Sequence, residues 1–178
     1  MPKPTTPPAP SSPPIRVASL AETTRWCDRW RAAGDRIVVT NGCFDLLHVG
    51  HVRYLEAARA LGDRLVIALN DDASVHHLKG AGRPILPAAE RAELLAALRS
   101  VDVVTVFEGP TAVGVVAALR PFVYVKGGDY DPTAHRPPEA DAAEAIGAIV
   151  RFVPFVDGRS TRSIIAAIRA GESAGEPR

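Results

Sequence analysis

The strongest constraint on the fold is the alternation of short apolar segments, rich in β-branched residues, with segments of helical periodicity. Buried strands are predicted at residues 36–40, 64–70, 101–107, 122–126 and 148–155. Helices are predicted at residues 20–33, 51–61, 87–99, 111–119, 138–146 and 160–170, with a polar loop at residues 71–84. Because such strands are joined by crossovers, the alternation predicts an α/β fold with a five-stranded parallel sheet and helices on both faces.

Composition divides the chain into one folded domain and two loose ends. A length of 178 residues is enough for one domain with a hydrophobic core. Seven of the sixteen prolines fall in the first 14 residues, where little apolar surface is available for burial. We therefore expect a disordered Pro-rich segment at residues 1–15, the folded domain at residues 16–170 and a flexible tail at residues 171–178.

Charge and cysteine content exclude several classes of function. A formal net charge of +1 gives no long-range field toward nucleic acid or an anionic membrane, so neither is expected as a partner. Two cysteines, Cys27 and Cys43, cannot build a disulfide framework or a Cys-rich zinc site, and they are expected to be free thiols. No signal-peptide core or membrane-length apolar run is apparent, which predicts a cytoplasmic protein.

The loop after the first predicted strand carries the clearest functional pattern. Ligands of parallel sheets bind beyond the carboxyl ends of the strands. Gly42 follows the strand directly, where the absence of a Cβ allows backbone to approach a ligand. His48 and His51 lie three residues apart at a predicted helix start, so both imidazoles share one face, and Gly50 leaves room for a phosphate. The pattern favours a phosphate site, with a capping pair of surface histidines and a metal pair as alternatives.

Residues 42–51, GCFDLLHVGH, resemble the GxFDxxHxGH signature of the cytidylyltransferase-like superfamily. That resemblance implies a Rossmann-like fold and transfer of a nucleotidyl group from ATP or CTP to a phosphate or phosphorylated alcohol. It also implies that His48 and His51 stabilise the transition state at the α-phosphate. Neither conclusion follows from spacing alone.

Four further stretches narrow the resemblance to one family. They are TNGCFD at 40–45, LKG with RP at 78–84, VKGGDY at 125–130 and GRST at 158–161. In this order they are similar to the D-glycero-β-D-manno-heptose 1-phosphate adenylyltransferases, which make ADP-heptose from ATP and a sugar 1-phosphate. The resemblance runs from about residue 19 to residue 170. It implies Mg²⁺ accompanying ATP, no protein metal site, a homodimer and a separate heptose kinase in the same pathway.

The resemblance assigns roles residue by residue. Lys79 joins the two histidines as a catalytic group, in a flexible Gly-flanked loop that closes over phosphates. The nucleotide is assigned to Asn41, Gly42, Cys43, Phe44, Asp45, Gly50, Lys126, Gly128, Asp129, Ser160 and Thr161. The sugar phosphate is assigned to Asp72, Arg91 and Lys79.

Several of these residues also have structural interpretations. Lys79 and Arg91 could be solvated surface charges, and Asp129, assigned to the ribose hydroxyls, could be a turn residue. Ser160 and Thr161 are good N-cap residues in any case. The family usually reads Ser-Thr-Thr at the last helix start, whereas this chain has Arg162 in the third position.

The expected reaction is an in-line displacement of pyrophosphate by the sugar phosphate, without a protein nucleophile. One alternative is a CTP-dependent enzyme acting on glycerol 3-phosphate or another polyol phosphate. A second is a nucleotide-binding module without turnover, against which the intact His48, His51 and Lys79 argue.

Overall fold

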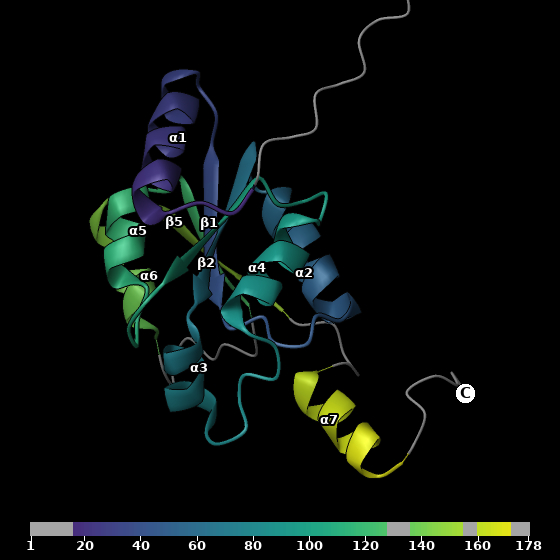
Figure 1. Ribbon diagram of the computed structural model, residues 1–178. Coiled ribbons are helices and arrows are strands. Elements are labelled where there is room, and N and C mark those ends of the chain that lie inside the picture. Colours follow the sequence, from purple (N-terminus) through teal and green to yellow (C-terminus); the bar gives the residue numbers. More distant parts are fainter. Residues whose placement is uncertain (1–15, 128–135, 155–159, 172–178) are drawn as a thin grey trace, which may run out of the picture.

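A parallel five-stranded sheet forms the centre of the computed structural model, which describes residues 16–127, 136–154 and 160–171 (Figure 1). The strands are β1 (Ile37–Gly42), β2 (Arg64–Asn70), β3 (Val103–Phe107), β4 (Val123–Gly127) and β5 (Ile149–Val153). Their order is β3-β2-β1-β4-β5, and every neighbouring pair is parallel. The predicted fold class is confirmed.

Helices cover both faces of this sheet. They are α1 (Leu20–Ala32), α2 (Val49–Arg59), α3 (Asp72–Lys79), α4 (Ala88–Ala96), α5 (Val113–Leu119), α6 (Pro138–Ala145) and α7 (Thr161–Arg169). Figure 1 shows α1, α5 and α6 on one face and α2 and α4 on the other. No described helix combines the length and the apolar character needed to cross a bilayer.

Alternate residues of the central strand supply two hydrophobic cores. Val38 is buried with Leu55 and Leu95 under α2 and α4, whereas Val39 is buried with Cys27 and Val116 under α1 and α5. Because β1 and β2 are covered on both sides, eleven of their thirteen residues are buried, including the apolar runs at residues 37–39 and 65–69. Both Cys27 and Cys43 are free thiols, as expected.

The strand order reverses direction between β1 and β4. From β1 the chain moves outward through β2 to β3, and then returns to the other side of β1 for β4 and β5. A crevice opens at the carboxyl ends of the strands at such a switch point. The loops after β1 and β4 therefore meet at the place where a ligand is expected.

The predicted polar loop at residues 71–84 is wrong in its first half, which forms helix α3. The Asp71 carboxylate caps this helix by accepting a hydrogen bond from the Ser74 N–H at 2.9 Å. The Ser74 hydroxyl donates to the Gly109 carbonyl at 2.8 Å, and Val75 is buried. Lys79 consequently ends a capped helix and does not lie in a flexible loop. Gly80, with φ of 88°, terminates α3 in a backbone conformation that suits glycine.

Several expectations concern residues beyond the described ranges. The predicted disordered segment at residues 1–15, the predicted tail from residue 172 onward, and the assignments of Gly128 and Asp129 all lie outside the residues that the structure describes.

Candidate active site

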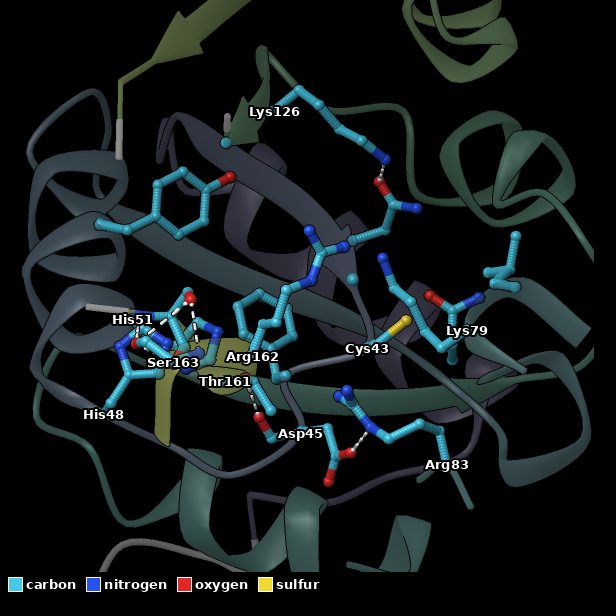
Figure 2. Close-up of a pocket in the computed structure, with 18 of the residues that line it drawn as sticks. Cys43, Asp45, His48, His51, Lys79, Arg83, Lys126, Thr161, Arg162 and Ser163 are labelled. Atoms are coloured by element: carbon cyan, nitrogen blue, oxygen red, sulfur yellow. Dashed lines mark hydrogen bonds and ion pairs between the residues drawn. The ribbon is translucent and has the colours of Figure 1, made fainter. Parts of the chain in front are cut away.

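A cavity of about 950 Å³ lies at the switch point, within the size range of small-molecule sites. Figure 2 shows side chains from several elements directed into it. Its lining contains the following residues assigned from sequence: Asn41, Gly42, Cys43, Phe44, Asp45, His48, His51, Lys79, Lys126, Ser160 and Thr161. Three described residues with assigned roles do not line it: Gly50, Asp72 and Arg91.

The two histidines stack at the start of α2. Their ring centroids are 4.0 Å apart, with 28° between the ring planes. His48 is the N-cap, and its Nδ1 accepts a hydrogen bond from the Gly50 N–H at 3.1 Å. Gly50 is thus buried in the first turn, where it orients the His48 ring. The expectation that both imidazoles share one face at a helix start is met.

His51 is poised as a neutral hydrogen-bond donor. Burial, followed by the proximity of His48, lowers the pKa of His51 to about 4. Its Nδ1 atom is buried and has no hydrogen-bond partner among the described residues. The Phe44 ring packs edge-on against His51, with centroids 5.5 Å apart. A neutral imidazole carries one N–H group, which can donate a hydrogen bond to an anionic oxygen.

The absence of a side chain at Gly42 leaves room for the Phe44 ring as well as for a ligand. A Cβ on Gly42 would lie 3.0 Å from the Cε2 atom of Phe44, so a larger residue would displace that ring. Phe44 and Leu46 both adopt positive φ, at 44° and 49°. Left-handed backbone at two non-glycine residues is uncommon and concentrates at functional sites. The loop holds this shape in order to place the aromatic ring beside His51.

Asp45 connects the loop after β1 to two other segments by hydrogen bonds. Its buried carboxylate accepts from Arg83 Nε at 2.6 Å and from the N–H groups of Ile85 and Leu86 at 2.9 and 3.1 Å. Burial raises the pKa of Asp45, but these hydrogen bonds outweigh burial and the net pKa is lowered. The Asp45 carbonyl accepts from the Thr161 hydroxyl at 2.6 Å. These bonds join the loop after β1 to the segment before α4 and to the start of α7.

A second network orients Lys126 at the end of β4. Its ammonium donates to Asn41 Oδ1 at 2.9 Å, and the Tyr124 hydroxyl donates to the same oxygen at 2.6 Å. Asn41 Nδ2 donates to Glu139 Oε1 at 3.4 Å, and the Ala112 N–H donates to that oxygen at 3.0 Å. Burial lowers the pKa of Lys126, whereas the Glu139 carboxylate opposes this shift.

Arg91 is a buried structural link, and its interpretation as a solvated charge is wrong. The side chain is fully buried on α4 and donates to the carbonyls of Cys43 at 2.6 Å, Asn70 at 3.0 Å and Leu86 at 2.9 Å. Its remaining nitrogen pairs with Asp72 at 2.7 Å. Arg91 therefore connects the loops after β1 and β2, which position the pocket wall.

Ser160 caps α7, as predicted. Its hydroxyl accepts from the Ser163 N–H at 3.1 Å, and the Ser163 hydroxyl in turn accepts from the Ser160 N–H at 3.0 Å.

The Cys43 thiol also lines the pocket. Burial raises its pKa, so this group is protonated near neutral pH and is not a nucleophile.

Sequence reasoning assigned no role to several residues of the site. Among them, Arg83 and Glu139 line the cavity, and the Tyr124 hydroxyl donates a hydrogen bond to Asn41. Glu139 lies in the first turn of α6, where an acidic residue is ordinarily explained by the helix dipole. No three His, Cys, Asp or Glu side chains gather closely enough to hold a metal ion within the part of the chain that is described.

Comparison with known proteins identifies the family. The cytidylyltransferase-like family model matches residues 39–169. The bifunctional protein HldE of Methylococcus capsulatus is 57% identical over 145 residues, 79% of this chain and 30% of that protein. HldE of Geotalea uraniireducens is 53% identical over 141 residues, 79% of this chain and 28% of that protein. The chain thus spans less than a third of the length of these relatives.

A solved structure agrees with this match. The lipopolysaccharide core biosynthesis protein of Thermoplasma volcanium has a TM-score of 0.58 and 25% identity, covering 71% of this chain and all of that one. The family model covers well over half of the sequence and includes the second half of β1, the histidine pair and α7. With its parallel sheet and its stacked histidines at the switch point, the chain belongs to the cytidylyltransferase-like family.

Proposed function

We propose that the chain transfers an adenylyl group from ATP to a sugar 1-phosphate, specifically D-glycero-D-manno-heptose 1-phosphate, giving ADP-heptose and pyrophosphate. The observation that carries this proposal is the stacked His48–His51 pair at a helix start inside a cavity lined by lysines. Similarity to HldE proteins over most of the chain supports a sugar phosphate as the acceptor.

The reaction is an in-line displacement at the α-phosphorus of ATP. An oxygen of the sugar phosphate forms the new P–O bond, while the bond to the pyrophosphate oxygen breaks. The acceptor is already an anion at neutral pH, so no residue has to remove a proton from it. Catalysis therefore depends on positioning and on stabilisation of negative charge in the transition state.

The histidines supply that stabilisation. Neutral His51 donates a hydrogen bond to an α-phosphate oxygen, and His48 acts beside it at the N-terminus of α2, where backbone N–H groups add positive potential. Because these donors are fixed by the Gly50 and Phe44 contacts, they require little reorganisation during the reaction.

Lysines and helix starts hold the remaining phosphate groups. Lys79 extends into the cavity from the end of α3, and Lys126 from the end of β4 (Figure 2). The capped start of α7, with Ser160 and Thr161, accommodates the β- and γ-phosphates. Asp129 and Gly128, although outside the described residues, are proposed to bind the ribose.

Arg91 and Asp72 have an indirect role in this proposal. Because Arg91 is buried and binds the Cys43 carbonyl, it positions the loop after β1, which is assigned to the nucleotide, and does not itself contact a substrate. Asp72 fixes the Arg91 guanidinium.

Mg²⁺ is proposed to enter with ATP. It binds phosphate oxygens and water readily and needs few protein ligands, which suits a pocket whose described lining has more basic side chains than carboxylates. When bound, it neutralises charge on the pyrophosphate leaving group. The proposal also includes three properties of the protein in the cell. The chain forms a homodimer, a separate kinase supplies the sugar 1-phosphate, and the reaction takes place in the cytoplasm, where ATP is available.

A pyrophosphate-release screen tests this function. The purified chain would be given ATP or CTP with both anomers of heptose 1-phosphate, other hexose 1-phosphates and glycerol 3-phosphate. We expect release with ATP and a heptose 1-phosphate. Release only with CTP and glycerol 3-phosphate would replace the proposal by a cytidylyltransferase, and ATP binding without any release would indicate a module that lacks turnover.

A further inference from the structure

We propose that Arg162, on the first turn of α7, binds a phosphate group of the reacting substrates. This inference rests on the proposed function and adds a residue to its site. Arg162 lines the cavity, and Figure 2 shows its side chain extending into the same space as Lys79 and Lys126.

The backbone that carries Arg162 is bonded to the loop after β1, which leads to the histidine pair. The preceding residue, Thr161, donates its hydroxyl to the Asp45 carbonyl at 2.6 Å. The Asp45 carboxylate is itself held by Arg83 and by two backbone N–H groups. The helix start is therefore fixed relative to the loop that bears the histidines, and Arg162 enters the pocket from a defined position.

The guanidinium of Arg162 is available for a ligand. Its side chain is exposed and makes no hydrogen bond or ion pair with any described residue. The neighbouring arginines differ, because Arg83 donates to Asp45 and Arg91 is bound to three carbonyls and a carboxylate. An arginine that extends into a cavity with its donors unused is suited to a partner that arrives from solution.

Charge in the cavity indicates that this partner is an anion. Among the described residues of its lining there are two carboxylates: Asp45 is engaged by Arg83, and Glu139 accepts from Asn41 and Ala112. Neither carboxylate accepts a hydrogen bond from Arg162. A phosphate monoester carries about −1.5 to −2 charge at neutral pH, and the planar guanidinium binds two of its oxygens at once. The ammonium groups of Lys79 and Lys126 act as point charges, whereas the Arg162 guanidinium can donate two parallel hydrogen bonds to one phosphate.

Three variants test the inference. Arg162→Met removes the charge at similar length, Arg162→Lys keeps the charge without the fork, and Arg169→Met is the control. Arg169 ends the same helix, is exposed and does not line the cavity. The KM values for ATP and for heptose 1-phosphate would be measured, with calorimetric Kd values for each ligand as a readout independent of turnover.

We expect Arg162→Met to raise both the KM and the Kd of one substrate by about tenfold to one hundredfold. Arg162→Lys should recover part of that affinity, and Arg169→Met should match the unsubstituted chain. A rise confined to ATP places the guanidinium on the triphosphate, and a rise confined to the sugar phosphate places it on the acceptor.

The inference is overturned if Arg162→Met keeps the unsubstituted melting temperature and unchanged KM and Kd values for both substrates. Failure of the proposed function has a different signature. In that case the unsubstituted chain releases no pyrophosphate from any substrate pair, while the calorimetric comparison still decides whether Arg162 binds phosphate.

Discussion

The half-buried His51 imidazole makes stability depend on pH. Its pKa is about 4 in the folded chain, against 6.5 as the ordinary value for the unfolded chain. Between these values the unfolded chain binds more protons than the folded chain, so the free energy of unfolding falls as pH is lowered from about 6.5 to about 4. At pH 5 the loss from this one group is about 2 kcal/mol.

A pair of variants isolates this effect. Urea unfolding at pH 8 and pH 5 should show that the unsubstituted chain loses about 2 kcal/mol more between the two conditions than His51→Gln does. His77→Gln, which removes an exposed imidazole outside the cavity, is the control and should lose as much as the unsubstituted chain. Equal losses in all three proteins would refute the assignment of a depressed pKa to His51.

Nuclear magnetic resonance would measure the same property directly. The His51 ring should titrate near pH 4 without ligand, and addition of ATP should raise its pKa because phosphate oxygens stabilise the imidazolium form. A His51 titration near pH 6.5 in the free protein would contradict the reasoning.

Four further substitutions probe the fold and the site. Asp45→Ala removes a buried carboxylate and its bonds to Arg83 and two backbone N–H groups, and should cost roughly 3–5 kcal/mol in urea unfolding. Gly62→Ala should destabilise the fold by about 1–3 kcal/mol because its Cβ would lie 2.5 Å from the Arg36 carbonyl oxygen. Gly114→Ala on α5 places its Cβ with no neighbouring atom within 4 Å, so it should stabilise the fold by up to about 1 kcal/mol. Glu139→Gln removes the charge that opposes the lowered pKa of Lys126, so the alkaline limb of the kcat/KM profile should move to lower pH.

Matched controls exist for two of these predictions. Asp63→Ala removes an exposed ion pair with Arg36 and should cost far less stability than Asp45→Ala. Glu144→Gln lies on the same helix as Glu139 but pairs with Arg136 outside the cavity, so its pH profile should not change. An Asp45 variant as stable as the Asp63 variant, or identical profiles for both glutamate variants, would contradict the contacts described above.

The sheet was predictable because its central strands β1 and β2 are buried on both faces. Burial of this kind demands continuous β-branched and apolar residues in β1 and β2, and such runs are visible in the sequence without any knowledge of the structure. Helix α3 was missed because its stabilising contacts are a side-chain cap from Asp71 and a long-range bond from Ser74 to Gly109. Neither contact produces apolar periodicity, so the segment resembled a loop.

The site was predictable only where its residues are adjacent in sequence. His48 and His51 lie in one loop and one helix turn, so their spacing carries their geometry. Glu139 reaches Asn41 across 98 residues, and Arg91 reaches the Cys43 carbonyl across 48. Because side-chain contacts over such separations depend on the packed fold, no local pattern announces them. The close approach of Phe44 to Gly42 is local, but it depends on the positive φ of Phe44, which no sequence pattern indicated.

Turnover of the His51→Ala variant tests the central claim most directly. With ATP and heptose 1-phosphate as substrates, pyrophosphate release would be followed for the unsubstituted chain, for His51→Ala and for a His77→Ala control. Loss of one preorganised donor at the α-phosphate should lower kcat by about 10²–10³ while the KM values change little, and the control should retain full activity. Near-normal kcat in folded His51→Ala would contradict the account, because the stacked histidine pair would then not be the catalytic group of this cavity.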